Sequence, residues 1–260
     1  MFKKLIASAV ISLGLAVSGS ASAVIVSGVD FGNLGNRHIE TTTLAETFVN
    51  GVGQTLTGYG QVNTVNGNLL YAGANRLYFE LNYTVTSINA NAVAFDGGVV
   101  TLYLLPTFNL TLQSSADNIN LIRAGVTWAT LEGHASSPSG SELTASGVLS
   151  GANTLSFNGQ GLLSVTSGAN GVFDFLNAND ILDGLGGVAD ISVTTSGNNA
   201  GLNQFDNTTG CATGQAVAGQ FCFAGSADLR GNTIPEPGVL ALVGLGLLGM
   251  GATLRKRKSV

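Results

Sequence analysis

The chain contains 260 residues, and its composition excludes several broad classes of protein before any motif is considered. Charged residues make up 10% of it, hydrophobic residues make up 45%, and the formal net charge is −5. The hydrophobic share is too high for a disordered acidic chain, and the negative charge argues against nucleic acid as a partner. Two cysteines and two histidines leave little material for a metal site built from those residues.

The charges are distributed unevenly along the chain. Two lysines stand near the amino terminus, and four basic residues stand at the other end, namely Arg255, Lys256, Arg257 and Lys258. The stretch between them, Val24 to Ile234, has four arginines, no lysine and fourteen acidic residues, which is a formal charge of −10. We expect such a body to repel phosphate backbones and anionic lipid, and to tolerate or attract divalent cations.

The first 23 residues have the three parts of a secretory signal peptide. The two lysines supply positive charge, and an apolar run from Leu5 to Val17 follows. Ala21 and Ala23 occupy the small-residue positions before a cleavage site at Val24. The apolar run has about 13 residues, fewer than the roughly 20 that span a membrane. We therefore expect export and cleavage by signal peptidase before Val24.

Residues 24–233 are predicted to form one β-rich ectodomain. Between Arg76 and Asn89, apolar side chains such as Leu77 and Phe79 alternate with polar ones. This alternation is typical of a strand with one buried face and one solvent-exposed face. Further strands are expected at residues 54–64, 99–105, 108–112, 122–131, 141–149, 154–157, 161–167, 172–175 and 191–195.

Turn residues separate these segments at the spacing of a β-sandwich or barrel. Asn-Gly or Asp-Gly dipeptides, which favour tight turns, occur at residues 66–67, 96–97 and 158–159. The predicted fold class is all-β, an antiparallel β-sandwich of the jelly-roll kind, with one short helix at residues 179–185. A β-solenoid is the alternative, because a Gly-Ala-Asn tripeptide occurs twice, although a solenoid needs more repeats to bury its core.

A proline motif, an apolar run and a basic cluster follow one another at the carboxyl terminus. Pro235, Glu236 and Pro237 come first, and the uncharged run Gly238–Leu254 is at the short end of a spanning helix. The basic cluster ends it and stays in the cytoplasm by the positive-inside rule. This arrangement resembles the PEP-CTERM sorting signal, which would take up residues 234–260.

The resemblance implies a processing route for the protein. Proteins with this signal are substrates of exosortase, a membrane enzyme of Gram-negative bacteria that resembles a transpeptidase. The implied precursor is anchored in the inner membrane by its transmembrane sorting helix and is cut near Pro235. The product goes to the cell surface or the extracellular matrix, often alongside exopolysaccharide. The alternative is a plain single-pass anchor that stays attached to the chain.

Few residues between Val24 and Ile234 suggest a disulfide, a catalytic site or a metal site. Cys211 and Cys222 are expected to form a disulfide, because an exported chain meets an oxidising compartment. His38 and His134 lie in no hydrolase motif and are interpreted as ordinary strand or loop residues. A loose acidic cluster offers oxygen ligands to Ca²⁺, although no EF-hand loop is present and turn chemistry is the simpler explanation; its members are Asp174, Asp180, Asp183 and Asp190. No other metal and no cofactor is expected.

These patterns predict a non-enzymatic exported protein with a structural or adhesive role in exopolysaccharide, biofilm or floc formation. A carbohydrate-binding module is the alternative, because Tyr78 shares the predicted wet face with Glu80 and Asn82, although burial of its ring is the simpler expectation. An exported hydrolase is a third hypothesis, and it requires two facing carboxylates about 5–10 Å apart. The expected partners are signal peptidase, exosortase, the membrane and exopolysaccharide.

Overall fold

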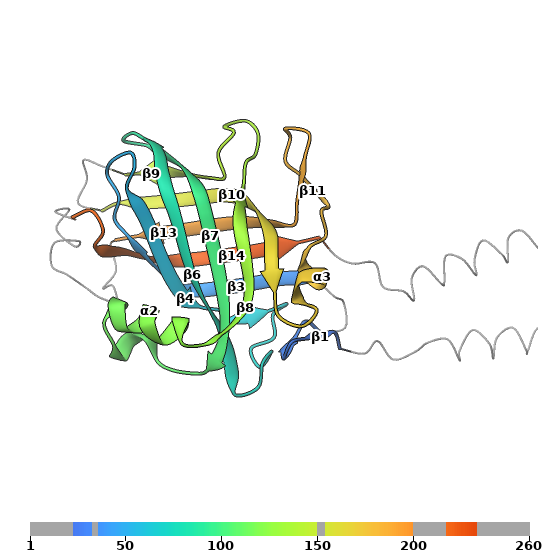
Figure 1. The fold of residues 1–260 in the computed structure, drawn as a ribbon. Helices are drawn as coiled ribbons and strands as arrows, with labels where there is room; N and C mark the ends of the chain where they lie inside the picture. Colours follow the sequence, from blue (N-terminus) through green and yellow to red (C-terminus); the bar gives the residue numbers. More distant parts are fainter. Residues whose placement is uncertain (1–22, 33–35, 150–153, 200–216, 233–260) are drawn as a thin grey trace, which may run out of the picture.

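Eight antiparallel strands follow one another around a closed barrel in the computed structural model, which describes residues 23–32, 36–149, 154–199 and 217–232 (Figure 1). Each strand pairs with the next one along the chain, and the last pairs with the first. The barrel strands are β3 (Arg37–Thr47), β4 (Thr55–Gln61), β6 (Asn75–Ile88), β7 (Ala92–Pro106), β8 (Val126–His134), β10 (Ser156–Gly168), β13 (Ile191–Asn198) and β14 (Phe221–Gly231).

Short elements cover the barrel or extend it. Strand β5 pairs with β3, while β1 with β2 and β11 with β12 form separate two-stranded pairs. Their bounds are β1 (Ile25–Val26), β2 (Val29–Asp30), β5 (Thr64–Val65), β11 (Ile181–Leu182) and β12 (Val188–Ala189). The helical elements are η1 (Leu110–Leu112), α2 (Ser115–Arg123) and α3 (Val172–Leu176).

Two successive strands fill one position in the barrel wall. β8 pairs with the second halves of β7 and β10, whereas β9 (Leu143–Val148) pairs with their first halves. Between them the chain leaves the wall and returns through a bridge of Ser136 with Ser141. Glu142 marks the return, because its Oε2 accepts a hydrogen bond of 2.6 Å from the Gly98 amide. The chain therefore forms a long loop between β8 and β9, and the barrel wall stays closed because both strands pair with β7 and β10.

Apolar side chains fill the barrel interior, and the first strands of the body cover one of its ends. The Trp128 ring, 1% exposed, stacks on Phe31 with centroids 6.1 Å apart. Phe31 in turn contacts Phe175 in α3 at 4.6 Å. The Asn66 amide donates a hydrogen bond of 2.6 Å to the Phe31 carbonyl. The β1–β2 pair and α3 thus close this end with aromatic rings, which supply large buried areas.

Helix α2 and the segment before it cover part of the outer wall. Tyr59 and Tyr78 point outward from β4 and β6, yet both are fully buried because Leu110 and Ile122 pack on them. The Tyr78 ring stacks on Phe108 with centroids 4.5 Å apart, and its hydroxyl donates to the Phe108 carbonyl. The expectation that Tyr78 is buried rather than displayed is therefore confirmed.

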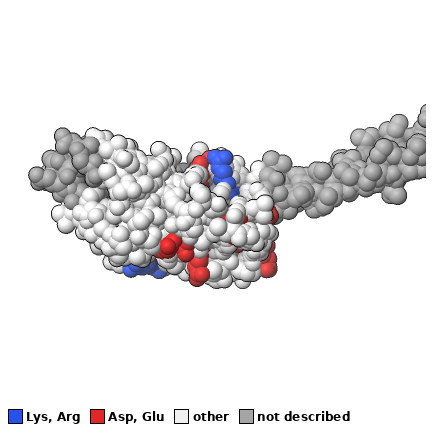
Figure 2. Space-filling model, turned by 90° about the horizontal axis from the view of Figure 1, so that it is seen from above, with Lys and Arg blue, Asp and Glu red and all other residues white. Residues whose placement is uncertain are grey.

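An ion pair fixes the end of this helix to the wall. Arg123 donates two hydrogen bonds to the Glu80 carboxylate, of 2.7 and 2.5 Å. Burial alone would raise the pKa of Glu80, but the bonds from Arg123 and Asn82 outweigh it and hold that pKa below its ordinary value. Other charged side chains are few and scattered on the face of the molecule seen in Figure 2.

The prediction of an antiparallel, mostly β fold is confirmed, but the sandwich and the solenoid are wrong because the strands close into one barrel. Closure depends on β3 and β14, and neither strand was predicted. Their pairing shifts register twice, between Phe221 and Phe223 and between Gly225 and Ala227. Such irregularities place neighbouring residues on unexpected faces, so the period of two that identifies a strand is lost.

Several local predictions are also corrected. Residues 172–175 form part of α3, where Val172 and Leu176 are buried at helical spacing, and 108–112 contain the short helix η1. Residues 179–185 contain β11 instead of a helix. The dipeptides at 96–97 and 158–159 lie inside strands, whereas 66–67 form a turn with φ of 50° and 77°.

Both predicted targeting signals fall almost entirely outside the described residues. Of the signal peptide, residues 1–23, only Ala23 is described, and the sorting signal at 234–260 is not described. Within the described ranges, no helix has the length and hydropathy needed to cross a membrane.

Candidate functional site

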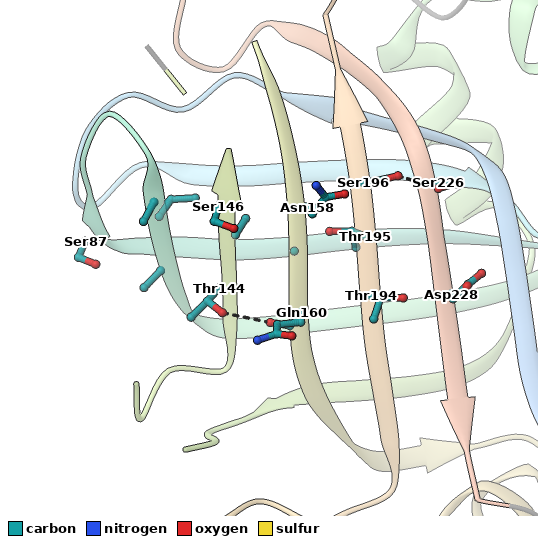
Figure 3. Close-up of a pocket in the computed structure, with 15 residues that line it drawn as sticks. Ser87, Thr144, Ser146, Asn158, Gln160, Thr194, Thr195, Ser196, Ser226 and Asp228 are labelled. Atoms are coloured by element: carbon teal, nitrogen blue, oxygen red, sulfur yellow. Dashed lines mark hydrogen bonds between the residues drawn. The ribbon is translucent and has the colours of Figure 1, made fainter. Parts of the chain in front are cut away.

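A polar hollow of about 680 Å³ lies over β9, β10, β13 and β14, and Ser87 of β6 and the start of β7 also line it (Figure 3). Side chains two residues apart on a strand share a face, so each strand contributes a pair of outward groups. Its polar lining includes Thr144 and Ser146 of β9, Asn158 and Gln160 of β10, Thr194 and Ser196 of β13, and Ser226 and Asp228 of β14. Hydroxyl and amide groups dominate this lining, and Asp228 is its one charged residue.

Part of the polar lining is available to an external ligand. Ser196 and Ser226 hydroxyls bind each other at 2.9 Å across β13 and β14. The amides of Asn158 and Gln160 are exposed, and neither side chain forms a hydrogen bond within the described part of the chain. Each free amide offers both donors and an acceptor. The hollow can therefore bind a ligand that is itself rich in hydroxyl groups.

A second unusual feature is a buried carboxyl inside the barrel. Glu46 is 3% exposed and lies at the far end of β3 from Arg37, which binds the Leu176 carbonyl of α3. It borders two apolar spaces that admit a water-sized molecule over about 40 and 30 Å³. Burial raises the pKa of Glu46 to about 8. Spaces of this size hold water rather than a larger ligand, so the interior is not the candidate site.

A third feature joins a serine, a histidine and an aspartate. His134 lies 2.9 Å through Nδ1 from the Ser164 hydroxyl and 3.0 Å through Nε2 from Asp183. The hydrogen bond from His134, with the Leu185 and Gly187 amides, lowers the pKa of Asp183 to about 2. These are the members of a hydrolytic triad, so the site must be tested for the other parts of that machinery.

The surroundings of Ser164 favour a structural role for this network. An acyl-transfer site needs amide donors beside the nucleophile to stabilise an oxyanion. Ser164 lies within the paired strand β10, and the amide of the next residue, Val165, donates to the Asp190 carboxylate at 2.8 Å. The Ser137 amide also binds the Asp183 carbonyl. The network thus fastens the β11–β12 pair to the loop between β8 and β9.

Comparison with protein families gives one match, at residues 233–258, to the PEP-CTERM protein-sorting motif. The chain carries a PEP-CTERM sorting signal. The motif indicates an exported, membrane-anchored precursor that exosortase sorts to the cell surface. It includes Pro235, Glu236 and Pro237 and the basic cluster Arg255–Lys258. Comparison with the curated proteins and with the solved structures gives no match.

The residues predicted for calcium do not come together as one cluster in the described part of the chain. Asp180 lies 3.5 Å from Arg37, and Asp183 binds His134. Among the described residues, one group of three or more His, Cys, Asp or Glu side chains has its ligand atoms within 4.8 Å of one another, namely His38, Glu40 and Asp228, and Asp174 is not part of it. The sequence analysis did not identify this group, because Asp228 lies far along the chain from His38 and Glu40.

The predicted disulfide remains a prediction. Cys222 lies on β14 and is 2% exposed, packed with Leu155 and Phe223. Cys211 falls outside the described residues. The polar hollow was not predicted either, because its lining comes from strands that only long-range pairing brings side by side.

Proposed function

We propose that the exported chain is a non-enzymatic protein of the cell surface or extracellular matrix, and that its barrel holds neutral exopolysaccharide in the polar hollow. The observation that carries the proposal is the lining of that hollow, where hydroxyl and amide groups from β9, β10, β13 and β14 face solvent together. A polysaccharide presents a similar density of hydroxyl donors and acceptors. Rigid strands position the lining without the entropy cost of ordering loops.

Charge favours a neutral polymer over an acidic one. The body from Val24 to Ile234 has a formal charge of −10, and Asp228 itself lines the hollow. An anionic polymer would be repelled over the whole surface. Because aromatic residues are missing from the lining of the hollow, stacking on sugar rings contributes little there, and single contacts are weak. Retention would then depend on many contacts along one polymer, which suits an adhesive role in a matrix.

The test compares strains that carry different versions of this one protein. A deletion strain is complemented with the wild-type gene, with the double variant Asn158→Ala/Gln160→Ala, or with Asn120→Ala on α2 as a matched exposed control. We expect the double variant to lose at least about tenfold in retention on isolated neutral polysaccharide, and to restore less flocculation. The Asn120→Ala strain should match the wild type.

Two results would contradict the proposal. One is a wild-type protein that no neutral polysaccharide retains. The other is a deletion strain whose aggregation and matrix composition are unchanged. Circular dichroism of each variant shows whether a loss of retention comes from a loss of fold.

A further inference from the structure

Three metal-ligating side chains meet on the outer face of the seam that closes the barrel. His38 and Glu40 are two residues apart on β3, so both point to the same side of the strand. Asp228 lies directly opposite Glu40 on β14. One ligand atom from each of the three residues lies within 4.8 Å of the other two, and His38 Nε2 is 3.1 Å from Glu40 Oε1.

The cluster has negative charge that its neighbours compensate only in part. Two carboxylates face each other across adjacent strands, an arrangement that destabilises a sheet unless a cation lies between them. Arg230 approaches Asp228 at 3.3 Å, but it is an exposed side chain that can turn away. Thr64 donates a hydrogen bond to Glu40 Oε2, which orients that carboxylate and leaves Oε1 as the oxygen beside His38 Nε2.

The His38 imidazole also has a ring nitrogen that is not hydrogen-bonded. His38 Nε2 is buried from solvent and forms no hydrogen bond within the described part of the chain. Its near neighbour is Glu40 Oε1 at 3.1 Å, outside hydrogen-bond geometry, and a metal ion is a partner that imidazole and carboxylate accept together.

We propose that His38, Glu40 and Asp228 bind a zinc ion that ties β3 to β14. One imidazole nitrogen and two carboxylate oxygens are ligands that Zn²⁺ takes at about 2.0–2.2 Å, and three protein ligands leave its fourth tetrahedral position for water. Small rotations of the three side chains bring their atoms to these distances. Ca²⁺ is disfavoured because it takes six to eight oxygen ligands and no imidazole.

The position of the site gives the ion a structural role. β3 and β14 are the first and last strands of the barrel, so a ligand shared between them stabilises the closure itself. The acidic body raises the local concentration of cations around it. Asp228 belongs to the polar hollow as well, and Figure 3 shows it at one side of that lining. The zinc site nevertheless does not depend on polysaccharide binding.

The test uses the full-length protein stripped of metal with a chelator. Calorimetric titration should show one zinc ion bound per chain, at least about a hundredfold more tightly than Ca²⁺. The melting temperature should rise with added zinc, because the ion binds only the folded state. His38→Ala and Asp228→Asn should each weaken zinc binding by roughly tenfold or more, whereas His134→Gln, a change in the other histidine, should leave it unchanged.

A gain in affinity separates a metal site from a simple network of ion pairs. Arg230→Gln removes the cation that competes for Asp228, so zinc should bind several-fold more tightly to this variant than to the wild type. The proposal is overturned if the wild type binds no zinc, if His38→Ala binds zinc as well as the wild type, or if Ca²⁺ binds equally tightly. It is also overturned if the loss occurs in His134→Gln instead.

Discussion

The two ends of the barrel interior differ in what they contain. At one end, Phe31, Trp128 and Phe175 fill the space between the β1–β2 pair, β8 and α3, which lie close together in Figure 1. Towards the other end, Glu46 borders two small apolar spaces, with Phe48 and Phe157 in the surrounding wall. The first end is packed with rings, and the second holds a carboxyl among apolar groups.

This difference separates residues that stabilise the fold from one that opposes it. Buried rings contribute through the apolar area they remove from water. A buried carboxyl without a charged partner costs free energy whenever it must ionise. Variants at the two ends should therefore change stability in opposite directions, and three of them test this in order of expected effect.

The largest effect is expected from Trp128→Ala at the packed end. Removing the ring leaves a cavity between Phe31 and the barrel wall, which should lower the free energy of unfolding by about 3–5 kcal/mol. Phe173→Ala, an aromatic change at the exposed face of α3, is the matched control and should cost less than about 1 kcal/mol. Urea denaturation measures both. Equal losses in the two variants would show that this end is not the packed region we describe.

The second effect concerns Glu46 and has the opposite sign. Its pKa is about 8 in the folded protein and 4.5 in an ordinary environment, so the unfolded chain releases the proton first as pH rises. Wild-type stability should then fall between pH 4.5 and 8 by about 1.4 kcal/mol per pH unit from this group. Glu46→Gln removes that fall and should be more stable at pH 7 by up to about 3 kcal/mol.

The exposed Glu132→Gln is the control for this pH series. It should follow the wild-type curve in urea denaturation at each pH. A wild-type curve that does not diverge from the Glu46→Gln curve above pH 4.5 would contradict the unpaired, buried state of Glu46.

The smallest effect is expected from Asn66→Gly, which loosens the cover of the packed end. Asn66 has φ of +50°, so glycine keeps the backbone while the bonds from its amide to the Phe31 and Asn36 carbonyls are lost. The variant should lose about 1–2 kcal/mol. Ser27→Gly, also at positive φ in the same cover, should be neutral or slightly stabilising. Hydrogen exchange of the Phe31 amide, which binds the Val24 carbonyl, reports the loosening directly, and unchanged exchange would contradict it.

Local patterns in the sequence were sufficient to predict part of the fold and the sorting signal of the chain. The alternation around Leu77 and Phe79 predicted β6 almost to its ends, because one face of that strand is buried from Leu77 to Val85. The order of Pro235-Glu236-Pro237, apolar run and basic cluster identified the sorting motif, because such signals are read as linear segments. Burial of Tyr78 was the simpler expectation and is confirmed.

Tertiary structure decided what the barrel displays. The pairing of β3 with β14 closes the wall and brings Asp228 opposite Glu40. The pairings of β9 with β10, β10 with β13 and β13 with β14 bring together the polar lining of the hollow. It also places Ser164, His134 and Asp183 in one network across separations of 30 and 49 residues. The sequence by itself determined that the body is acidic, and its terminal motif indicated export. The order of strands around a closed barrel depends on pairing between residues far apart in the sequence. The local alternation of apolar and polar residues does not predict that order.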